Sequence, residues 1–465
     1  MTARLKLIFI TGLCLWGGPF CFAQQSWWDL LKYEITINPS FQTRTLVGSN
    51  VISFQAIAAN SVLPIDLAQP LKITAVSWRG QRLPFNRQGN VYQLRFPKTI
   101  RRGSIESVTI QYAGIPKEVS AEKAPFESGW IWSKDEKGCP WMSLTCEGSG
   151  ASIWLPCKNQ SADEPDSGVI MHIVVPDSLI GIGNGRMLNK KVNGNGTSTY
   201  TWAVVSPINH YDIVPYIGKY VHWEEVFHGL EGPLDCQYWV LEDHLEKARL
   251  KFREVDTMLR AFEYWMGPYP FYKDGYKLVE APEYGGMEHQ SNIAYGNKFK
   301  MGLEGHDLSG TGIGLKWDFI IVHESGHEWF GNSITGRNDG PDDDSWIHEG
   351  FTKYTEVLFT DYVYGAEAAN TYYQGLLKRI KNDKPAMQGS SDKYYKGAAF
   401  LHNIHQQVGD SVFRGLLHGL NKKFYHQTVS TQQVVRYISD YIHKDITPLF
   451  DLYMRTTNLP PAAAH

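Results

Sequence analysis

The pentapeptide His323-Glu324-Ser325-Gly326-His327 places two imidazoles four residues apart, with a carboxylate directly after the first. On an α-helix, residues four apart are offset by about 40° and one turn, so both imidazoles face the same way and can bind one metal ion. Glu324 would then lie beside that ion, where a carboxylate can act as a general base. The spacing therefore predicts a metal-dependent hydrolytic site, with His323 and His327 as ligands.

The residues around this pentapeptide favour a buried helix. Phe319, Ile320, Ile321 and Val322 precede it without a break. Charged and imidazole side chains are costly to bury in such surroundings unless they are paired or bind a metal. The context therefore favours a metal site over a chance occurrence of the pattern.

A third ligand is expected downstream, because a catalytic zinc has three protein ligands and one open position. Glu349 is the best candidate, since it begins a second apolar-periodic segment that continues through Tyr354 to Tyr362. His348 is the alternative. On a helix His348 points about 100° away from Glu349, so only one of the two can face the metal.

The spacing of apolar residues changes along the chain, and this change indicates which elements position the site residues. From about 33 to 220 the apolar residues mostly alternate, as at Ile52, Phe54 and Ala56, which predicts strands. Asn193-Gly194-Asn195-Gly196 is typical of a hairpin turn between two of them. From Leu241 to Met266 the spacing changes to steps of three and four, which predicts an amphipathic helix that ends at Gly267-Pro268.

We therefore expect an α+β protein with a β-rich first half and a mainly helical second half. The predicted N-terminal β domain covers 24–235 and the predicted catalytic domain covers 236–455, with a tolerance of about ten residues at the boundary. The last residues, 456–465, contain two prolines and are expected to fray.

The composition excludes several classes of partner. The chain of 465 residues carries 45 basic and 48 acidic side chains, a net charge of −3, and 43% of its residues are apolar. This apolar content is enough for large cores, and the charge favours neither nucleic acid nor an anionic membrane.

Residues 1–23 have the features of an export signal. Arg4 and Lys6 precede an apolar run from Leu7 to Trp16, and Cys21-Phe22-Ala23 provides a small residue before a cleavage site. The run is too short for a membrane anchor, and no later stretch is apolar enough to span a bilayer. We expect a mature chain that begins near Gln24, carries no membrane span, and is periplasmic or secreted.

Cleavage would leave four cysteines, namely Cys139, Cys146, Cys157 and Cys236. An exported chain meets an oxidising compartment, so one or two disulfides are expected among three possible pairings. These cysteines lack the short paired spacing of a structural zinc site.

Beyond these local patterns, the chain resembles the gluzincin zinc aminopeptidases, typified by aminopeptidase N. Trp329-Phe330-Gly331-Asn332 and the segment Trp346 to Phe351 are similar to two motifs that accompany the zinc ligands of that family. The resemblance implies an N-terminal β-sandwich or saddle domain, a thermolysin-like catalytic domain, and one zinc ion held by His323, His327 and Glu349.

One departure from the family lies between the second and third ligands. Twenty-one residues, 328 to 348, separate His327 from Glu349, about three more than is usual in the family. The extra residues fall in the acidic stretch 338–344, which is interpreted as a solvated turn, with a calcium loop as the less favoured alternative.

Two further motifs resemble the segments with which the family binds a substrate amine. Gly285-Gly286-Met287-Glu288-His289 is similar to Gly-Ala-Met-Glu-Asn, which implies that Glu288 receives the α-ammonium group and that Gly285, Gly286 and Met287 border the substrate. His289 departs from the usual Asn. Thr145-Cys146-Glu147 resembles a segment that supplies a second acidic or amide group to the same amine, and a surface carboxylate is the less favoured alternative for Glu147.

The last motif, Tyr394-Tyr395-Lys396-Gly397, resembles Tyr-x-Lys-Gly. The resemblance implies that Tyr394 donates a hydrogen bond to the oxyanion of the reaction. A packing role is the alternative for this tyrosine pair. Glu356, two helical turns after Glu349, is predicted to accept a hydrogen bond from a ligand imidazole.

Together these residues predict an exported zinc aminopeptidase that acts on peptides with Glu324 as general base. Alternatives are a zinc endopeptidase and a non-catalytic protein that binds peptides or serves as a scaffold. The chain ends before the further domains that are common in the family. We therefore expect an open cleft, unless a homo-oligomer or a partner covers it.

Overall fold

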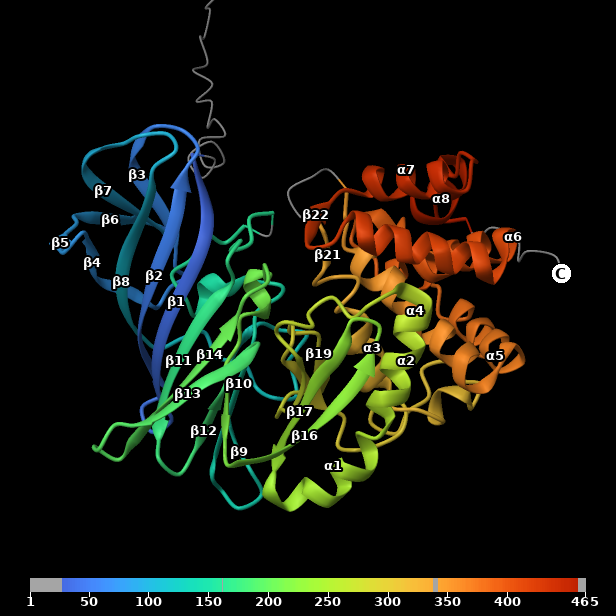
Figure 1. Ribbon diagram of the computed structural model, residues 1–465, viewed down its shortest axis with the longest axis horizontal. Coiled ribbons are helices and arrows are strands. Elements are labelled where there is room, and N and C mark those ends of the chain that lie inside the picture. Colours follow the sequence, from blue (N-terminus) through green and yellow to red (C-terminus); the bar gives the residue numbers. More distant parts are fainter. Residues whose placement is uncertain (1–26, 161, 338–341, 459–465) are drawn as a thin grey trace, which may run out of the picture.

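The computed structural model describes residues 27–160, 162–337 and 342–458. The predicted export signal and the end of the tail lie outside these residues, as do 338–341 of the acidic stretch. A strand-rich domain, coloured blue to green, lies beside a helical domain, coloured orange to red (Figure 1). The predicted α+β fold is confirmed. No helix in the described part of the chain is both long and apolar enough to cross a membrane.

The β domain is built mainly on an eight-stranded sheet. Strand β1 (Trp28–Ser40) pairs antiparallel with β2 (Thr45–Ala56) and parallel with β11 (Val169–Pro176). Ile52, Phe54 and Ala56 alternate into the core of this domain, as predicted. The predicted turn at 193–196 connects β13 (Arg186–Val192) with β14 (Thr197–Val204). In spatial order the strands are β13 (Arg186–Val192), β14 (Thr197–Val204), β11 (Val169–Pro176), β1 (Trp28–Ser40), β2 (Thr45–Ala56), β8 (Ile105–Gly114), β4 (Lys72–Trp78) and β5 (Gln81–Arg82).

Two smaller sheets complete this domain. The first contains β3 (Asn60–Asp66), β7 (Val91–Ile100) and β6 (Phe85–Gln88). The second contains β12 (Ile180–Ile182), β15 (Tyr216–Gly218), β10 (Pro140–Thr145) and β9 (Gly129–Lys134). Short 3-10 turns follow β10 and β14, at Ala151–Ile153 and His210–Asp212. The loop after β10 carries Glu147 toward the helical domain.

A five-stranded sheet lies between the two domains and contacts both. Its order is β16 (Tyr220–Gly229), β17 (Gly232–Leu241), β18 (Tyr276–Glu280), β20 (Ile293–Gly296) and β19 (Gly285–Met287). Tyr238 and Leu278 belong to the core on the helical side, whereas Trp239 and Val279 belong to the core of the β domain. The alternation along each strand therefore joins two hydrophobic cores through one sheet.

The change of period near Cys236 does not coincide with a gap between domains. Cys236 lies inside β17, and the hairpin of β16 and β17 shares its sheet with strands from the second half. The single helix predicted from 241 to 266 is also wrong in its first part. Leu241 ends a strand, and Phe252 and Arg253 separate α1 (Leu245–Lys251) from α2 (Glu254–Met266).

The remaining helices belong to the C-terminal half of the chain. They are α3 (Phe319–Gly326), α4 (Trp346–Tyr364), α5 (Ala366–Leu377), α6 (Asp392–Lys423), α7 (Thr431–Tyr441) and α8 (Thr447–Met454). Helix α6 is interrupted by the non-helical backbone of Gly409. Two 3-10 turns precede α1 and α3, at Glu242–His244 and Ile313–Leu315. The short elements between the later helices are β21 (Ile334–Gly336), a 3-10 turn at Ala386–Gln388, and β22 (Gln427–Val429).

Asp318 fixes the start of α3, the helix that carries the metal-binding pattern. Its carboxylate accepts hydrogen bonds from the backbone N–H groups of Ile320 and Ile321 at 3.1 and 3.3 Å. It also accepts from the Tyr295 hydroxyl on β20 and from the Asn297 amide, both at 2.7 Å. The N-terminal cap therefore ties α3 to the central sheet.

The expected disulfides are absent, because the four cysteines of the described residues are free thiols. Cys146 and Cys157 pack in the core of the β domain, whereas Cys236 packs in the core on the helical side. The Cys146 thiol donates to the carbonyl of Tyr211 at 3.3 Å, and burial raises its pKa above the usual value. These thiols act as small apolar side chains of two separate cores.

Candidate active site

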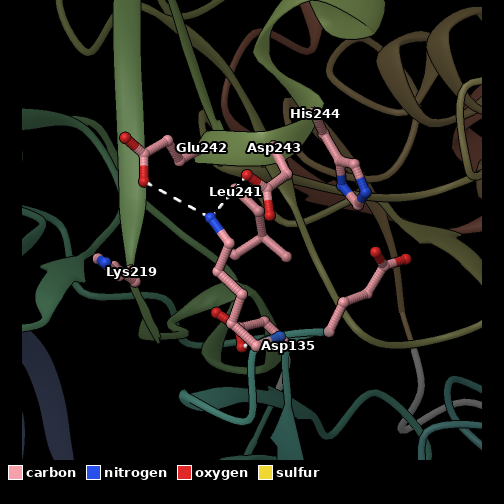
Figure 2. Close-up of a pocket in the computed structure, with 8 residues that line it drawn as sticks. Asp135, Lys219, Leu241, Glu242, Asp243 and His244 are labelled. Carbon is pink, nitrogen blue, oxygen red and sulfur yellow. Dashed lines mark hydrogen bonds and ion pairs between the residues drawn. The ribbon is translucent and has the colours of Figure 1, made fainter.

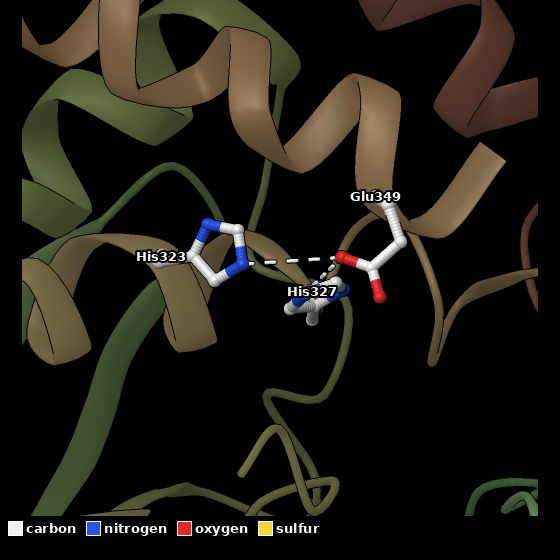
Figure 3. A group of neighbouring side chains, drawn as sticks. All are labelled: His323, His327 and Glu349. Carbon is white, nitrogen blue, oxygen red and sulfur yellow. Dashed lines mark ion pairs between the residues drawn. The ribbon is translucent and has the colours of Figure 1, made fainter. Parts of the chain in front are cut away.

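His323 on α3, His327 at the C-terminal cap of α3 and Glu349 in the first turn of α4 meet in one buried group (Figure 3). Their ligand atoms all lie within 4.8 Å of one another. The Nε2 atoms of His323 and His327 lie 3.9 and 3.6 Å from Oε2 of Glu349. Ligand atoms around a tetrahedral zinc lie roughly 3.4 Å apart, so this group is close to the dimensions of a zinc site.

The hydrogen bonds around the two imidazoles leave the correct nitrogens free for a metal. Nδ1 of His323 lies 2.7 Å from Oε1 of Glu356, and Nδ1 of His327 lies 3.1 Å from the carbonyl oxygen of Phe330. A carbonyl oxygen can only accept, and so can an ionised carboxylate, so each Nδ1 carries the proton and each Nε2 offers its lone pair.

Glu349 supplies the third candidate ligand, and its carboxylate is ionised with one oxygen free to bind a metal. Its Oε1 accepts from the Tyr394 hydroxyl at 2.7 Å, while its buried Oε2 has no hydrogen-bond partner. Burial by itself raises the pKa of Glu349. The nearby His327 and His323 lower this pKa by more than burial raises it, so it lies below its ordinary value. Burial also lowers the pKa of His323 to about 4, which favours its neutral form. Two neutral imidazoles and one carboxylate with free lone pairs fit zinc.

His348 does not take part in this group. Its Nε2 accepts from the backbone N–H of Gly336 on β21 at 2.7 Å. The two candidates for the third ligand are thus separated by the helix geometry, and Glu349 faces the imidazoles. The predicted contact of Glu356 with a ligand imidazole is present.

Two further carboxylates border the same site. Glu288 follows the edge strand β19, and its side chain, that of Glu324 and that of His327 place ligand-type atoms within 4.8 Å of one another. The Tyr211 hydroxyl donates to Oε1 of Glu288 at 3.2 Å. Burial, followed by the charge of Glu349, raises the pKa of Glu288 to about 7. Burial and the charge of Glu288 also raise the pKa of Glu324.

Glu147 reaches this site from the β domain. Its side chain keeps contact with solvent, but desolvation by the surrounding protein and then the charges of Glu288 and Glu349 raise its pKa to about 8. The structure therefore brings together all the predicted site residues, although their roles stay predictions.

Glycines in two of the motifs allow neighbouring elements of the site to approach closely. A Cβ atom on Gly286 of β19 would lie 2.6 Å from Cγ2 of Ile320 and 3.1 Å from Cγ of Glu324. A Cβ atom on Gly397 of α6 would lie 2.6 Å from Cα of Gly350 on α4. The second contact is the crossing that lets the Tyr394 hydroxyl reach Glu349.

Sequence reasoning missed several contacts in the site. Tyr211 lies in the β domain outside any periodic segment, so no local pattern connects it to Glu288. Lys353 donates to Oε1 of Glu356 at 2.6 Å, and Tyr372 donates to its Oε2 at 2.7 Å. The three-residue spacing of Lys353 and Glu356 on a predicted helix could have revealed the first of these pairs.

A second pocket, away from the metal-binding group, lies where the two domains meet (Figure 2). Lys137 extends from the connection between β9 and β10, and its Nζ lies 2.7 Å from Asp243 and 3.9 Å from Glu242. These side chains are about half exposed, so the ion pairs contribute little to stability. We interpret this pocket as a polar contact between domains.

Residues 252–393 match the Peptidase family M1 domain. The chain contains an M1 peptidase domain. The matched range includes Glu288 and all three predicted zinc ligands, and it ends one residue before Tyr394.

The sequence is also similar to two named enzymes. It is 22% identical to leukotriene A-4 hydrolase from Xenopus laevis, over 96% of this chain and 74% of that protein. It is also 22% identical to leucyl aminopeptidase from Saccharolobus solfataricus, over 90% of this chain and 52% of that protein. The chain thus spans about half of the second relative.

The fold of the whole chain is similar to that of a solved protein of nearly the same length. This is a mutant M1 zinc metallopeptidase from Deinococcus radiodurans bound to a Tyr-Ser-Ala substrate, with a TM-score of 0.79 and 20% identity. The match covers 94% of this chain and 96% of that one.

The two neighbouring candidates for the third ligand provide a matched pair of variants. We expect Glu349→Gln to weaken zinc binding to the M1 domain by about a hundredfold or more, because it replaces the carboxylate that faces the imidazoles. His348→Gln should keep stoichiometric zinc, since its amide oxygen can still accept from Gly336. Competition with a chromogenic chelator measures both, and zinc loss in His348→Gln alone would contradict the assignment.

The crossing of α4 and α6 gives a second prediction. Gly397→Ala should lower the free energy of unfolding by about 1–3 kcal/mol, because the new methyl group overlaps Gly350. It should also displace Tyr394 from Glu349. In a double-mutant cycle by urea unfolding, Tyr394→Phe should therefore cost less in the Gly397→Ala background than in the wild type. Strict additivity would show that the crossing does not set this hydrogen bond.

Proposed function

We propose that the protein is an exported zinc aminopeptidase that removes the N-terminal residue from peptides. The observation that carries this proposal is the position of Glu288, whose carboxylate lies beside both Glu324 and the metal-binding His327. A carboxylate at this distance can hold an α-ammonium group while the first peptide bond lies at the metal. The aminopeptidase relative and the tripeptide-bound structural neighbour support the same class of substrate.

The excess of negative charge explains why a free amine would bind here. Burial and the charges of Glu288 and Glu349 raise the pKa of Glu147, and burial and the charge of Glu349 raise the pKa of Glu288, so the repulsion among these carboxylates favours binding of a proton or a cation. An ammonium group between them removes this repulsion, whereas an acetylated N-terminus leaves two carboxylates without a counter-charge. The site thereby favours N-terminal over internal cleavage.

Different residues of the chain would bind the metal, transfer the proton and stabilise the oxyanion. Zinc held by His323, His327 and Glu349 would supply Lewis acidity toward the scissile carbonyl and a lowered pKa for water. Glu324, whose pKa burial raises, takes a proton from the attacking water and delivers it to the leaving amine. Tyr394 carries a hydroxyl donor next to Glu349, from where it can donate to the oxygen that develops negative charge.

A substrate panel tests this function. We expect hydrolysis of free aminoacyl amides but not of their N-acetylated forms, with loss of activity in a chelator and recovery with zinc. Glu324→Gln should lower kcat by about 10²–10⁴-fold with zinc still bound, because it removes the proton acceptor. His348→Gln serves as the matched control that retains activity. Cleavage of acetylated substrates would indicate an endopeptidase, and bound zinc without any turnover would indicate a peptide-binding protein.

Export is proposed from the N-terminal sequence alone. Arg4 and Lys6, the apolar run and Ala23 support a cleaved signal, and these residues lie outside the described structure. Expression of the full chain should yield a periplasmic or secreted protein whose N-terminal sequence begins near Gln24. An intact N-terminus on protein recovered only from the cytoplasm would contradict this proposal.

A further inference from the structure

We propose that Lys353 is a positioning residue that fixes the orientation of the His323 imidazole. This inference rests on the proposed role of His323 as a zinc ligand and extends it to a residue that does not contact the metal position. Lys353 lies on α4, one turn after Glu349, and its side chain is only 3% exposed. A lysine is costly to bury, so its charge needs a specific partner there.

Lys353 is connected to His323 through a hydrogen bond with Glu356, which also contacts the imidazole. Oε1 of Glu356 lies 2.6 Å from Nζ of Lys353 and 2.7 Å from Nδ1 of His323. The same oxygen therefore joins the lysine and the imidazole. Tyr372 donates to the other oxygen at 2.7 Å, so the carboxylate is held at both ends and cannot rotate without losing a charge-assisted hydrogen bond.

Lys353 is also connected to the same imidazole through the Phe319 ring. Nζ of Lys353 lies 4.6 Å from the centroid of the Phe319 ring. That ring in turn stacks on His323, with 4.8 Å between centroids and 18° between planes. One ammonium group thus contacts both groups that hold the ring, the carboxylate at its edge and the aromatic ring on its face.

The His327 imidazole has different hydrogen-bond partners from the His323 imidazole. Comparing the two rings shows what Lys353 contributes to His323. Nδ1 of His327 lies near two neutral groups, the carbonyl of Phe330 at 3.1 Å and the hydroxyl of Thr352 at 3.2 Å. No charged group is among these contacts. The two ligand imidazoles therefore differ in their support, and the charged support of His323 depends on Lys353.

The consequence concerns how firmly zinc is held. Without Lys353 the Glu356 carboxylate loses one of its three donors, and Phe319 loses the cation on its face. Both changes let the His323 ring move away from the orientation in which its Nε2 faces Glu349. Loss of such supporting partners typically weakens metal affinity by about 10–100-fold.

The experiment compares Lys353→Met, which keeps the length of the apolar stem, with Lys277→Met. Lys277 is another buried lysine, but it donates to the carbonyls of Gly183 and Gly185 in the interdomain region. We expect zinc release to a chromogenic chelator to be about tenfold or more faster in Lys353→Met. It should remain within about twofold of wild type in Lys277→Met. The visible spectrum of the Co²⁺-substituted protein should change only in Lys353→Met.

A second variant covers the case in which Lys353→Met does not fold. Phe319→Leu leaves the contact between Lys353 and Glu356 intact and removes only the ring stacked on His323, so a smaller acceleration of zinc release is expected. Equal release rates in wild type, Lys353→Met and Phe319→Leu would overturn the proposal. These measurements need no peptide turnover. A wild-type protein that binds zinc but hydrolyses nothing would therefore refute the proposed activity and not this inference.

Discussion

The hydrogen bonds on the Nδ1 atoms of His323 and His327 are the contacts on which the site depends. They determine which nitrogen of each ring carries a proton, and so which nitrogen can bind a metal. They also compensate for the burial of two imidazoles in an apolar helix. The acceptors come from α4 and from the turn after α3. The packing of these two segments therefore determines which nitrogen of each ligand imidazole can bind the metal.

The part of the site that follows helical spacing could be predicted from the sequence. His323 and His327 share a face because they are four residues apart, and Glu356 lies two turns from Glu349. The roles of Glu288, Glu147 and Tyr394 needed the resemblance to a family, since nothing local relates them to α3. Tyr211 could not be found at all, because it lies 77 residues from Glu288 in the sequence and only the tertiary fold brings the two side chains together.

The errors in the predicted elements have physical causes of the same kind. Leu241 continues an apolar helical pattern, but its backbone pairs with Tyr220 in a hairpin, so tertiary pairing decides its structure. The four cysteines predicted disulfides on the expectation that the chain is exported, yet Cys236 is placed in a different core from Cys146 and Cys157. Sheet pairing and core membership are long-range properties that one-dimensional patterns do not contain.

The crossing of Gly350 and Gly397 has a consequence for how this sequence can evolve. The separation of α4 and α6 is set by two backbones and not by side chains that could repack around a replacement. Core positions elsewhere in these helices can exchange volume with their neighbours over generations. At the crossing no neighbour is available to compensate for one added methyl group. We therefore expect homologous lineages to diverge widely along both helices while both crossing positions stay glycine.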